Sequence, residues 1–120
     1  MNSFTILAVG HIATDPELEG SGDRARLQIP LIGNDYAGKD DEGGAVERTT
    51  QVYFTAFGSK AQTIAKYCRK GDQLICRARM QSNNYTDRAG EKVYSYNYVI
   101  EDFTFGAPGK AKREELAQEF

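Results

Sequence analysis

The sequence contains no tryptophan, one histidine, two cysteines and no long run of apolar residues. A helix that crosses a bilayer needs about 20 predominantly apolar residues, and no window of this chain approaches that composition. The first residues, MNSFTILAVGHIATDPE, carry no basic segment of the kind that opens a secretory signal peptide. These absences predict a soluble, intracellular protein, and its 120 residues suffice for one hydrophobic core.

The cysteines and the histidine are too few and too scattered for a zinc site or a catalytic set. Cys68 and Cys76 form no CxxC pair and have no histidine nearby. We expect both to be buried thiols. His11 has no partner that the sequence can nominate for acid-base or nucleophilic catalysis. The glycine-rich stretches lack the GK[ST] ending of a phosphate loop, so the sequence predicts no metal, no cofactor and no enzyme.

Charged residues are unevenly distributed along the chain, although the formal net charge is only −2. Residues 1–47 contain three Lys or Arg against nine Asp or Glu, residues 48–92 nine against three, and residues 93–120 three against five. A polyanionic partner would therefore meet the middle of the chain. Small soluble domains often show such unevenness by chance, so the pattern needs support from other residues.

Five segments have the alternation, or the β-branched and aromatic composition, of strands. In the second segment Ala25, Leu27 and Ile29 alternate with polar residues, and Pro30 restricts this strand to a sheet edge or a bulge. The glycine-rich, acidic residues 33–46 predict a long loop. The expected strands are residues 3–12, 24–32, 47–58, 72–82 and 93–105, with a hairpin around residues 87–90.

The third strand carries aromatic residues on both of its faces. Val52, Phe54 and Ala56 alternate with an outward set that includes Tyr53 and Phe57. Burial of one face alone does not require rings on the other. The outward rings are therefore candidates for contact with a ligand.

A short helix is expected between the third and fourth strands. Ser59 predicts its N-cap, Gln62 would complete a capping box, and Gly71 suits the C-terminal end. The apolar stripe of this helix predicts that it covers one side of a sheet. The stripe comprises Ala61, Ile64, Ala65 and Cys68, and the expected core face of the fourth strand comprises Leu74, Cys76, Ala78 and Met80.

This order of five strands, with one helix between the third and fourth, is that of the OB-fold. The OB-fold is an all-β, five-stranded Greek-key barrel that binds oligonucleotides across strands 2 and 3. Other small barrels also fit the pattern. We expect residues 1–105 to form the barrel domain, and residues 106–120, which have little apolar content, to form a short flexible tail.

Aromatic and basic residues are interleaved at positions expected outside the core. Single-stranded nucleic acid exposes bases that stack on aromatic rings, at about 1–3 kcal/mol each, and its phosphates follow a basic groove. Tyrosine also favours strands for structural reasons, and we expect Tyr94, Tyr96 and Tyr98 to serve the barrel wall or a subunit contact. The predicted nucleic-acid-binding residues are Tyr36, Lys39, Tyr53, Phe57, Lys60, Lys70, Asn84, Tyr85 and Arg88.

Three stretches, in order, resemble the bacterial single-stranded DNA-binding protein (SSB) family: VGHIATDPEL, FTAFGSKAQTIAKYCRKGDQL and NNYTDRAGEKVYSYNYVI. The resemblance covers about residues 3–104. It implies an OB-fold that protects single-stranded DNA in replication, recombination and repair, usually as a homotetramer, in the bacterial cytoplasm or nucleoid. The family's stacking aromatics fall on Tyr36, Phe57 and Tyr85, and two of its phosphate-facing lysines fall on Lys39 and Lys70.

The chain departs from the family pattern at several positions. Gln51 stands where the family often has a tryptophan, which predicts weaker binding per site because an amide cannot stack as an indole does. Asn83 and Asn84 stand where basic residues are common. Arg77 and Arg79 correspond to positions near the family's subunit contacts. They would serve an interface rather than DNA, or would disfavour a tetramer and leave a dimer.

The C-terminal residues differ most from the family, whose members commonly carry a long linker ending in an acidic tip with Pro-Phe. That tip recruits replication and repair enzymes. Here about fifteen residues follow the barrel and end in EELAQEF, so Phe120 and Glu119 are the residues predicted to bind a partner protein. Two alternatives stay open: an OB-fold primosome or recombination accessory that acts mainly through protein partners, and a small nucleic-acid enzyme, which the missing catalytic set disfavours.

Overall fold

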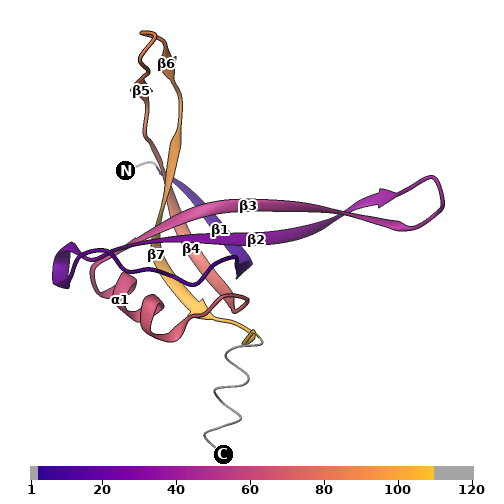
Figure 1. Cartoon of the computed structure of the whole chain (residues 1–120), viewed down its shortest axis with the longest axis horizontal. Coiled ribbons are helices and arrows are strands. Elements are labelled where there is room, and N and C mark those ends of the chain that lie inside the picture. Colours follow the sequence, from indigo (N-terminus) through magenta and orange to yellow (C-terminus); the bar gives the residue numbers. More distant parts are fainter. Residues whose placement is uncertain (1–2, 110–120) are drawn as a thin grey trace, which may run out of the picture.

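The computed structural model describes residues 3–109 and shows a closed five-stranded barrel with one helix and two projecting hairpins (Figure 1). The barrel strands follow the order β1-β2-β3-β7-β4, and β4 pairs with β1 to close it. The predicted five-stranded barrel with one helix after its third strand is confirmed. The elements are β1 (Phe4–Ile12), the 3-10 turn η1 (Gly22–Arg24), β2 (Arg26–Lys39), β3 (Ala45–Phe57), α1 (Gly58–Tyr67), β4 (Gln73–Ser82), β5 (Tyr85–Thr86), β6 (Lys92–Val93) and β7 (Tyr96–Phe105).

The barrel consists of two extensively paired parts that are joined by two short seams. β2 pairs with β3 along nearly the whole of both strands, and β4 pairs along its length with both β1 and β7. By contrast, β1 meets β2 and β3 meets β7 through two residue pairs each. The β3–β7 seam is parallel and pairs Phe54 with Tyr98 and Thr55 with Val99.

The core follows the alternation visible in the sequence. Leu27 and Ile29 on β2 are fully buried, whereas Gln28 between them is exposed. From α1, Ala61 and Ile64 join the same buried cluster, so the apolar stripe of the helix packs against the barrel as predicted. On β4 the expected core face is confirmed at Leu74, Cys76 and Ala78, and Met80, nearer the end of the strand, is half-buried.

Both cysteines are buried thiols, as the sequence predicts. Cys76 faces the interior from β4, and Cys68 directly follows α1. Burial raises the pKa of the Cys76 thiol from 9.0 to about 11, because the charged thiolate would lose its hydration in the core. The thiol is therefore protonated at neutral pH and contributes packing rather than reactivity.

Residues 33–46, predicted as a loop, are instead most of a two-stranded arm. β2 and β3 continue beyond the barrel and stay in register as far as Tyr36 opposite Glu47. The carboxylate of Asp40 makes the turn by accepting hydrogen bonds from two backbone N–H groups, at 3.0 and 2.7 Å. The prediction is wrong because both faces of the arm are exposed, so its sequence lacks an alternation of apolar and polar residues.

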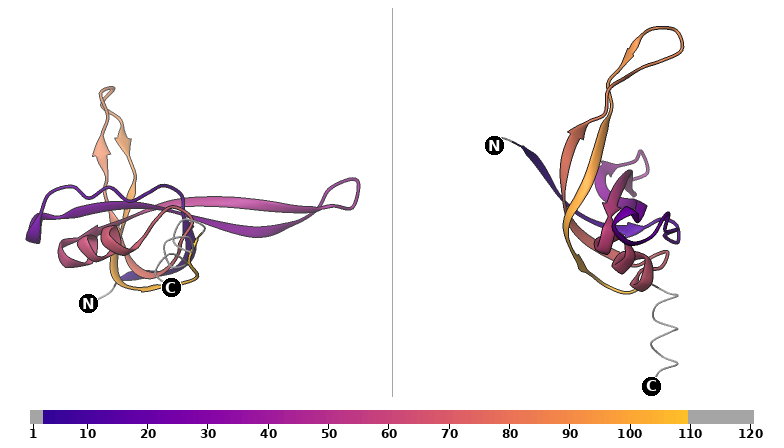
Figure 2. Two further views of the ribbon diagram at one scale, coloured as in Figure 1. Left: turned by 60° about the horizontal axis from the view of Figure 1, so that its bottom comes forward. Right: turned by 90° about the vertical axis from the view of Figure 1, so that its left-hand side faces the viewer.

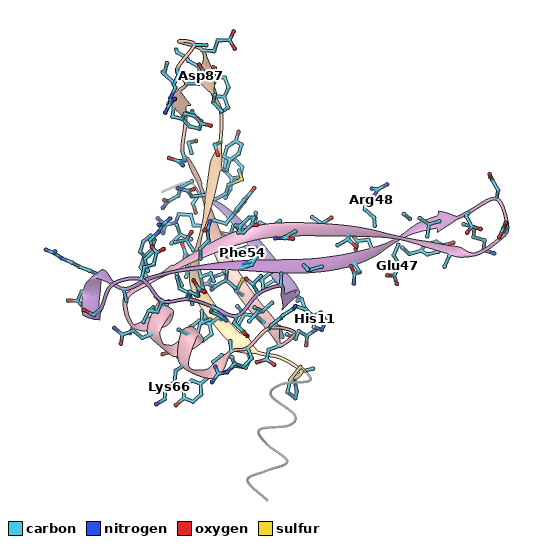
Figure 3. The ribbon with its side chains drawn as sticks, in the orientation of Figure 1. His11, Glu47, Arg48, Phe54, Lys66 and Asp87 are labelled. Carbon is cyan, nitrogen blue, oxygen red and sulfur yellow. The ribbon has the colours of Figure 1, made fainter. Side chains whose placement is uncertain are left out.

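A second arm, residues 83–95, continues from β4 and β7 and contains the short strands β5 and β6. Asp87 lies at its tip (Figure 3) and accepts hydrogen bonds from the N–H groups of Ala89 and Glu91 at 2.9 Å each. The hairpin predicted around residues 87–90 is thus confirmed. The two arms leave the barrel in different directions (Figure 1 and the left view of Figure 2).

The start of α1 differs from the predicted capping box. Phe57 occupies the N-cap position, and Ser59 lies in the first turn without capping the helix. The side chain of Gln62 donates a hydrogen bond to the backbone oxygen of Gly22 at 3.1 Å and so ties α1 to η1. Gly58, with φ of 63°, lets the chain turn directly from β3 into the helix. The predicted roles of Ser59 as N-cap and of Gln62 in a capping box are therefore wrong, because the side chain of Gln62 bonds to η1 rather than to the start of its own helix.

Pro30 lies in the middle of β2, where β2 pairs with β3 on one side and its pairing with β1 on the other side has just ended. Its carbonyl accepts a hydrogen bond from the N–H of Ala13 at 2.9 Å, just beyond the last residue pair with β1. The nitrogen and the carbonyl of a strand residue point to the same side. The N–H that proline lacks would therefore point away from β3, and the long β2–β3 pairing loses no hydrogen bond.

Candidate nucleic-acid interface

The pairing of β2 with β3 puts three predicted stacking residues on one face of the sheet. Directly opposed residues of an antiparallel pair point to the same face, and Tyr36 is opposite Glu47. Along β3, Glu47, Tyr53 and Phe57 share this face, which we call the outward face, and Figure 3 shows Glu47 and Arg48 on opposite sides of the arm. Tyr36, Tyr53 and Phe57 are 66%, 54% and 49% exposed.

Phe57 borders a hollow of about 290 Å³, which we call the Phe57 hollow. β7 lies between β3 and β4 here, because Val99 pairs with Thr55 on one side and with Arg79 on the other. The outward side chains of three strands therefore meet at this place. The hollow is lined by Phe57, Lys60, Arg79, Gln81, Val99, Ile100 and Glu101.

A carboxylate and two guanidinium groups form a cluster at this hollow. The Nε of Arg79 donates a hydrogen bond to Oε1 of Glu101 at 2.7 Å, and the Nε of Arg77 lies 3.9 Å from Oε2 of the same carboxylate. Lys60 adds a further cation from the first turn of α1. Each arginine thus has a partner within its own chain, and its predicted role at a subunit interface stays a prediction.

Tyr53 borders a second hollow, of about 410 Å³, on the side facing the loop between β1 and β2. This loop contributes Asp15, Glu17 and Glu19 to the lining. The carboxylate of Glu19 lies 3.8 Å from the guanidinium group of Arg26. Asp15 and Glu17 add two further carboxylates, so the lining beside the Tyr53 ring is acidic. A polyanion would be repelled there, so its favourable path leads from Tyr53 toward the cations of the Phe57 hollow.

Two of the predicted phosphate-binding lysines lie apart from this surface. Lys39 ends β2 at the tip of the arm, directly before three consecutive acids, residues 40–42. Lys70 follows α1, and its backbone N–H donates a hydrogen bond to Asp15 at 2.7 Å. Both side chains are exposed, but neither lines the Phe57 hollow.

The second arm carries the remaining predicted residues, Asn84, Tyr85 and Arg88, all of them exposed. Tyr85 is opposite Val93, and Arg88 lies in the turn. The side-chain oxygen of Asn84 accepts a hydrogen bond from the backbone N–H of Ser95 at 3.3 Å, so this residue also holds the arm together. The structure therefore distributes the predicted residues over the two arms, β3 and the region of α1, and does not gather them at one point.

The structure separates into two kinds the three tyrosines predicted to have structural roles, Tyr94, Tyr96 and Tyr98. Tyr98 belongs to the barrel wall, where its ring packs against Phe54 with centroids 5.8 Å apart. Tyr94 and Tyr96 are exposed, because β7 and the segment before it extend past the end of the barrel and cover no core. For these two the barrel-wall role is wrong, and a subunit contact stays a prediction.

The sequence did not reveal that Arg79, Gln81 and Glu101 lie beside Phe57. Their strands are far from β3 in the chain, and only the entry of β7 between β3 and β4 brings them together. The alternation of β4 could have indicated that Arg79 and Gln81 point away from the core. No local signal indicates Glu101.

This surface combines exposed aromatic rings with charged side chains. Within residues 3–109, no group of His, Cys, Asp and Glu side chains is placed to hold a metal ion, and no helix is long and apolar enough to span a bilayer. Exposed aromatic rings beside cations suit a ligand with planar bases and a negatively charged backbone. The predicted partner-binding residues, Glu119 and Phe120, lie outside the described residues.

Residues 1–106 match the sequence profile of the Single-strand binding protein family. The chain is similar to single-stranded DNA-binding protein 1 of Chlorobaculum tepidum, with 26% identity over 98 residues, which cover 81% of this chain and 60% of the relative. It is 30% identical over 103 residues to the single-stranded DNA-binding protein of Clostridium perfringens, covering 83% of this chain and 63% of the relative. The chain thus spans less than two thirds of the length of either relative.

Among solved structures, the fold is similar to that of Plasmodium falciparum SSB in its complex with ssDNA. The TM-score is 0.68 at 15% identity, and the match covers 88% of this chain and 99% of the other. At this identity the likeness concerns the fold. Together with the strand order of the barrel, it confirms the predicted OB-fold.

Proposed function

Because this chain belongs to the single-strand binding protein family, we propose that it binds and protects single-stranded DNA during replication, recombination or repair. Bases would stack on its aromatic rings, and phosphates would pair with Lys and Arg. Members of this family are DNA-binding proteins without enzymatic activity, so the prediction that the domain is not an enzyme is confirmed.

One observation carries the proposal: aromatic residues on β3 alternate between the core and the outward face. Phe54 is 2% exposed, whereas Tyr53 and Phe57 are about half exposed, and Tyr36 shares their face from β2. A single exposed ring is normal on a protein surface, but a row of three on one face indicates a binding surface. Stacking on such a row depends little on base identity, so binding with little sequence preference is expected.

Cations lie where the backbone of a stacked strand would pass. Lys60 and Arg79 line the hollow beside Phe57, and Arg88 lies on the second arm. The acidic loop beside Tyr53 favours a path toward these cations. We therefore propose that the DNA runs from the β2–β3 arm, across the Phe57 hollow, to the second arm with Tyr85.

Binding of oligo(dT) to single alanine variants tests the stacking surface. Tyr36→Ala, Tyr53→Ala and Phe57→Ala are each expected to weaken binding by about 1–3 kcal/mol, because each removes one stacking ring. Tyr67→Ala is the matched control, since Tyr67 is a partly exposed ring near the end of α1, against Phe105. Unchanged affinity in all three surface variants would contradict the proposal.

A salt titration distinguishes this function from that of an OB-fold accessory with weak DNA binding. A protein that neutralises several phosphates loses affinity steeply with salt, because it releases condensed counterions. We expect a linear plot of log affinity against log salt concentration with a slope that indicates several neutralised phosphates. Weak binding with a slope near zero would favour the accessory, whose main partner is protein.

We also propose that the chain forms a homo-oligomer. Within residues 3–109, β1 pairs with β2 only at His11 and Ile12, so the preceding residues of β1 present an unpaired edge on that side. Leu7 and Val9 are exposed there, and the adjoining hollow of about 280 Å³ has mainly apolar side chains, including Val52. An exposed apolar edge is a template for a further strand. The mass of the protein in solution would identify a dimer or a tetramer, and a monomer would contradict the proposal.

Two further predictions concern the cell. A role on single-stranded DNA would place the protein in the bacterial cytoplasm or nucleoid.

The sequence of the last residues, with Glu119 before Phe120, supports the proposal that they bind a replication or repair protein. Removal of the last four residues is expected to weaken binding to such host proteins while leaving affinity for oligo(dT) unchanged, and unaltered affinity for the proteins would contradict it.

A further inference from the structure

Among the described residues, Glu101 is the one acidic side chain in the lining of the Phe57 hollow. The parallel seam pairs Thr55 with Val99. Two residues further along each strand, Phe57 and Glu101 both line the Phe57 hollow, and Glu101 is the extra residue of a bulge in the pairing of β7 with β4. A carboxylate is therefore next to the ring on which a base is proposed to stack. Phosphates alone give no reason for it, since a carboxylate repels them.

The carboxylate of Glu101 is held in place and its charge is balanced. Its Oε1 accepts a hydrogen bond from Arg79 at 2.7 Å, and its Oε2 lies 3.9 Å from the Nε of Arg77. The side chain is 31% exposed, so it is neither free in solvent nor enclosed in the core. A carboxylate has about four lone-pair positions, and the hydrogen bond from Arg79 uses one of them. Acceptor positions remain for a ligand.

The hollow has the form of a site for one base. Its volume of about 290 Å³ is close to the lower end of the range for small-molecule sites. Phe57 provides a stacking face, Val99 an apolar contact, and Lys60 a cation for the adjoining phosphate. A base stacked on Phe57 would direct its polar edge toward the side chains of β7 and β4, among which Glu101 is an obligate acceptor.

The bases differ in what they offer to an obligate acceptor. Cytosine, adenine and guanine each carry an exocyclic amino group that donates hydrogen bonds, and Glu pairs with the amino group of cytosine in known recognition patterns. Thymine carries a carbonyl oxygen at the position of that amino group, which a carboxylate repels, and its one donor, the N3–H, lies between two such carbonyl oxygens. We propose that Glu101, positioned by Arg79 and Arg77, makes the Phe57 hollow selective for bases that carry an amino group over thymine. This rests on the proposed function, and it adds one selective position to a surface that otherwise stacks any base.

The test compares length-matched oligo(dC) and oligo(dT) at pH 8 and one salt concentration, for the wild type and Glu101→Gln. The measured quantity is the ratio of the two dissociation constants, so that intrinsic differences between the oligonucleotides cancel in the comparison of proteins. Glu101→Gln is expected to shift this ratio toward oligo(dT) by about fivefold or more, the lower end for a well-placed hydrogen bond to a base edge. An unchanged ratio would overturn the inference.

Glu19→Gln is the matched control, because Glu19 is also a carboxylate paired with an arginine, Arg26, at 3.8 Å. Both variants remove one negative charge and should strengthen binding to both oligonucleotides, but only Glu101→Gln should change the ratio. Glu101→Asp retains a carboxylate acceptor and should keep the wild-type ratio of dissociation constants. It shows that a changed ratio in Glu101→Gln does not arise merely from disturbing the structure at this position. Thermal unfolding verifies that each variant is folded. If wild-type protein binds neither oligonucleotide, the proposed function itself fails, and that result differs from an unchanged ratio.

Discussion

The two faces of β3 use the same kinds of residue for different purposes. Phe54, on the inner face, is buried against Tyr98, whereas Phe57, three residues later on the outward face, is half exposed beside Lys60 and Arg79. Burial of an aromatic ring stabilises the fold, because it removes a large apolar area from water. An exposed ring offers the same area to a ligand instead. Residues of one chemical type on one strand can therefore be separated into fold and function by their face alone.

The largest expected effect concerns the inner face. Phe54→Ala should lower the free energy of unfolding by about 3–5 kcal/mol, because it removes a ring from the core and leaves a cavity. Phe57→Ala should change it by no more than about 0.5 kcal/mol, as is usual for surface sites. Urea-induced unfolding measures both variants. Equal losses would mean that the two faces do not differ in the way proposed.

The inner face of β4 is expected to make the fold sensitive to alkali. The pKa of the Cys76 thiol is raised from 9.0 to about 11, so the folded protein holds this proton more tightly than the unfolded chain does. The stabilisation is fully present below pH 9.0 and is lost as the pH rises to about 11. Two pKa units correspond to about 3 kcal/mol.

Unfolding free energies at successive pH values, under reducing conditions, would show this loss. Cys76→Ala should be less stable at neutral pH because it leaves a small cavity, but it should lack the alkaline decline that depends on the thiol. A decline of the same size in the variant would assign it to other groups.

On the outward face, an added ring should strengthen binding. Gln51 is exposed and shares this face with Tyr53, so a ring placed there would extend the row of aromatic residues. Gln51→Trp should therefore increase affinity for oligo(dT) by about 1–3 kcal/mol, the contribution of one stacked base. Thr50→Trp, on the opposite face of the same strand, is the control and should give no such gain. Equal gains would indicate nonspecific attraction to tryptophan.

The smallest expected effect concerns charge. Lys60→Gln should reduce the slope of log affinity against log salt concentration by about 0.7, the value for one phosphate contact on a single strand. Lys66→Gln removes the same charge from a later turn of α1, where the ammonium lies 5.2 Å from the Tyr67 ring. This control should leave the slope unchanged. If both variants reduce the slope equally, the Phe57 hollow is not a preferred phosphate site.

Most of the barrel could be predicted because its signals are local. The alternation of Leu27 and Ile29 with polar neighbours, and the apolar stripe that includes Ile64, each depend on residues a few positions apart. The β2–β3 arm could not be predicted this way, because beyond Gly33 both of its faces are exposed. The helix start was missed because Gln62 bonds to η1, a partner 40 residues away.

The candidate site shows the same limit. Tyr53 and Phe57 could be predicted from the outward face of one strand. Glu101 could not, because it reaches Phe57 only through the β3–β7 seam, which joins segments more than 40 residues apart. Side chains gathered by nonlocal pairing leave no periodic signal in the sequence.

The shortness of that seam also has a dynamic consequence. Local opening of a protein is easiest where few backbone hydrogen bonds hold two parts together, and β3 meets β7 through only two residue pairs. Backbone amides at the seam should therefore exchange with solvent faster than those in the middle of the β2–β3 pairing. A DNA strand that contacts both Phe57 and Arg79 would span this junction and favour its closed form. Slower hydrogen exchange at the seam, with little change elsewhere in the barrel, would then report bound DNA even where the fold itself does not move.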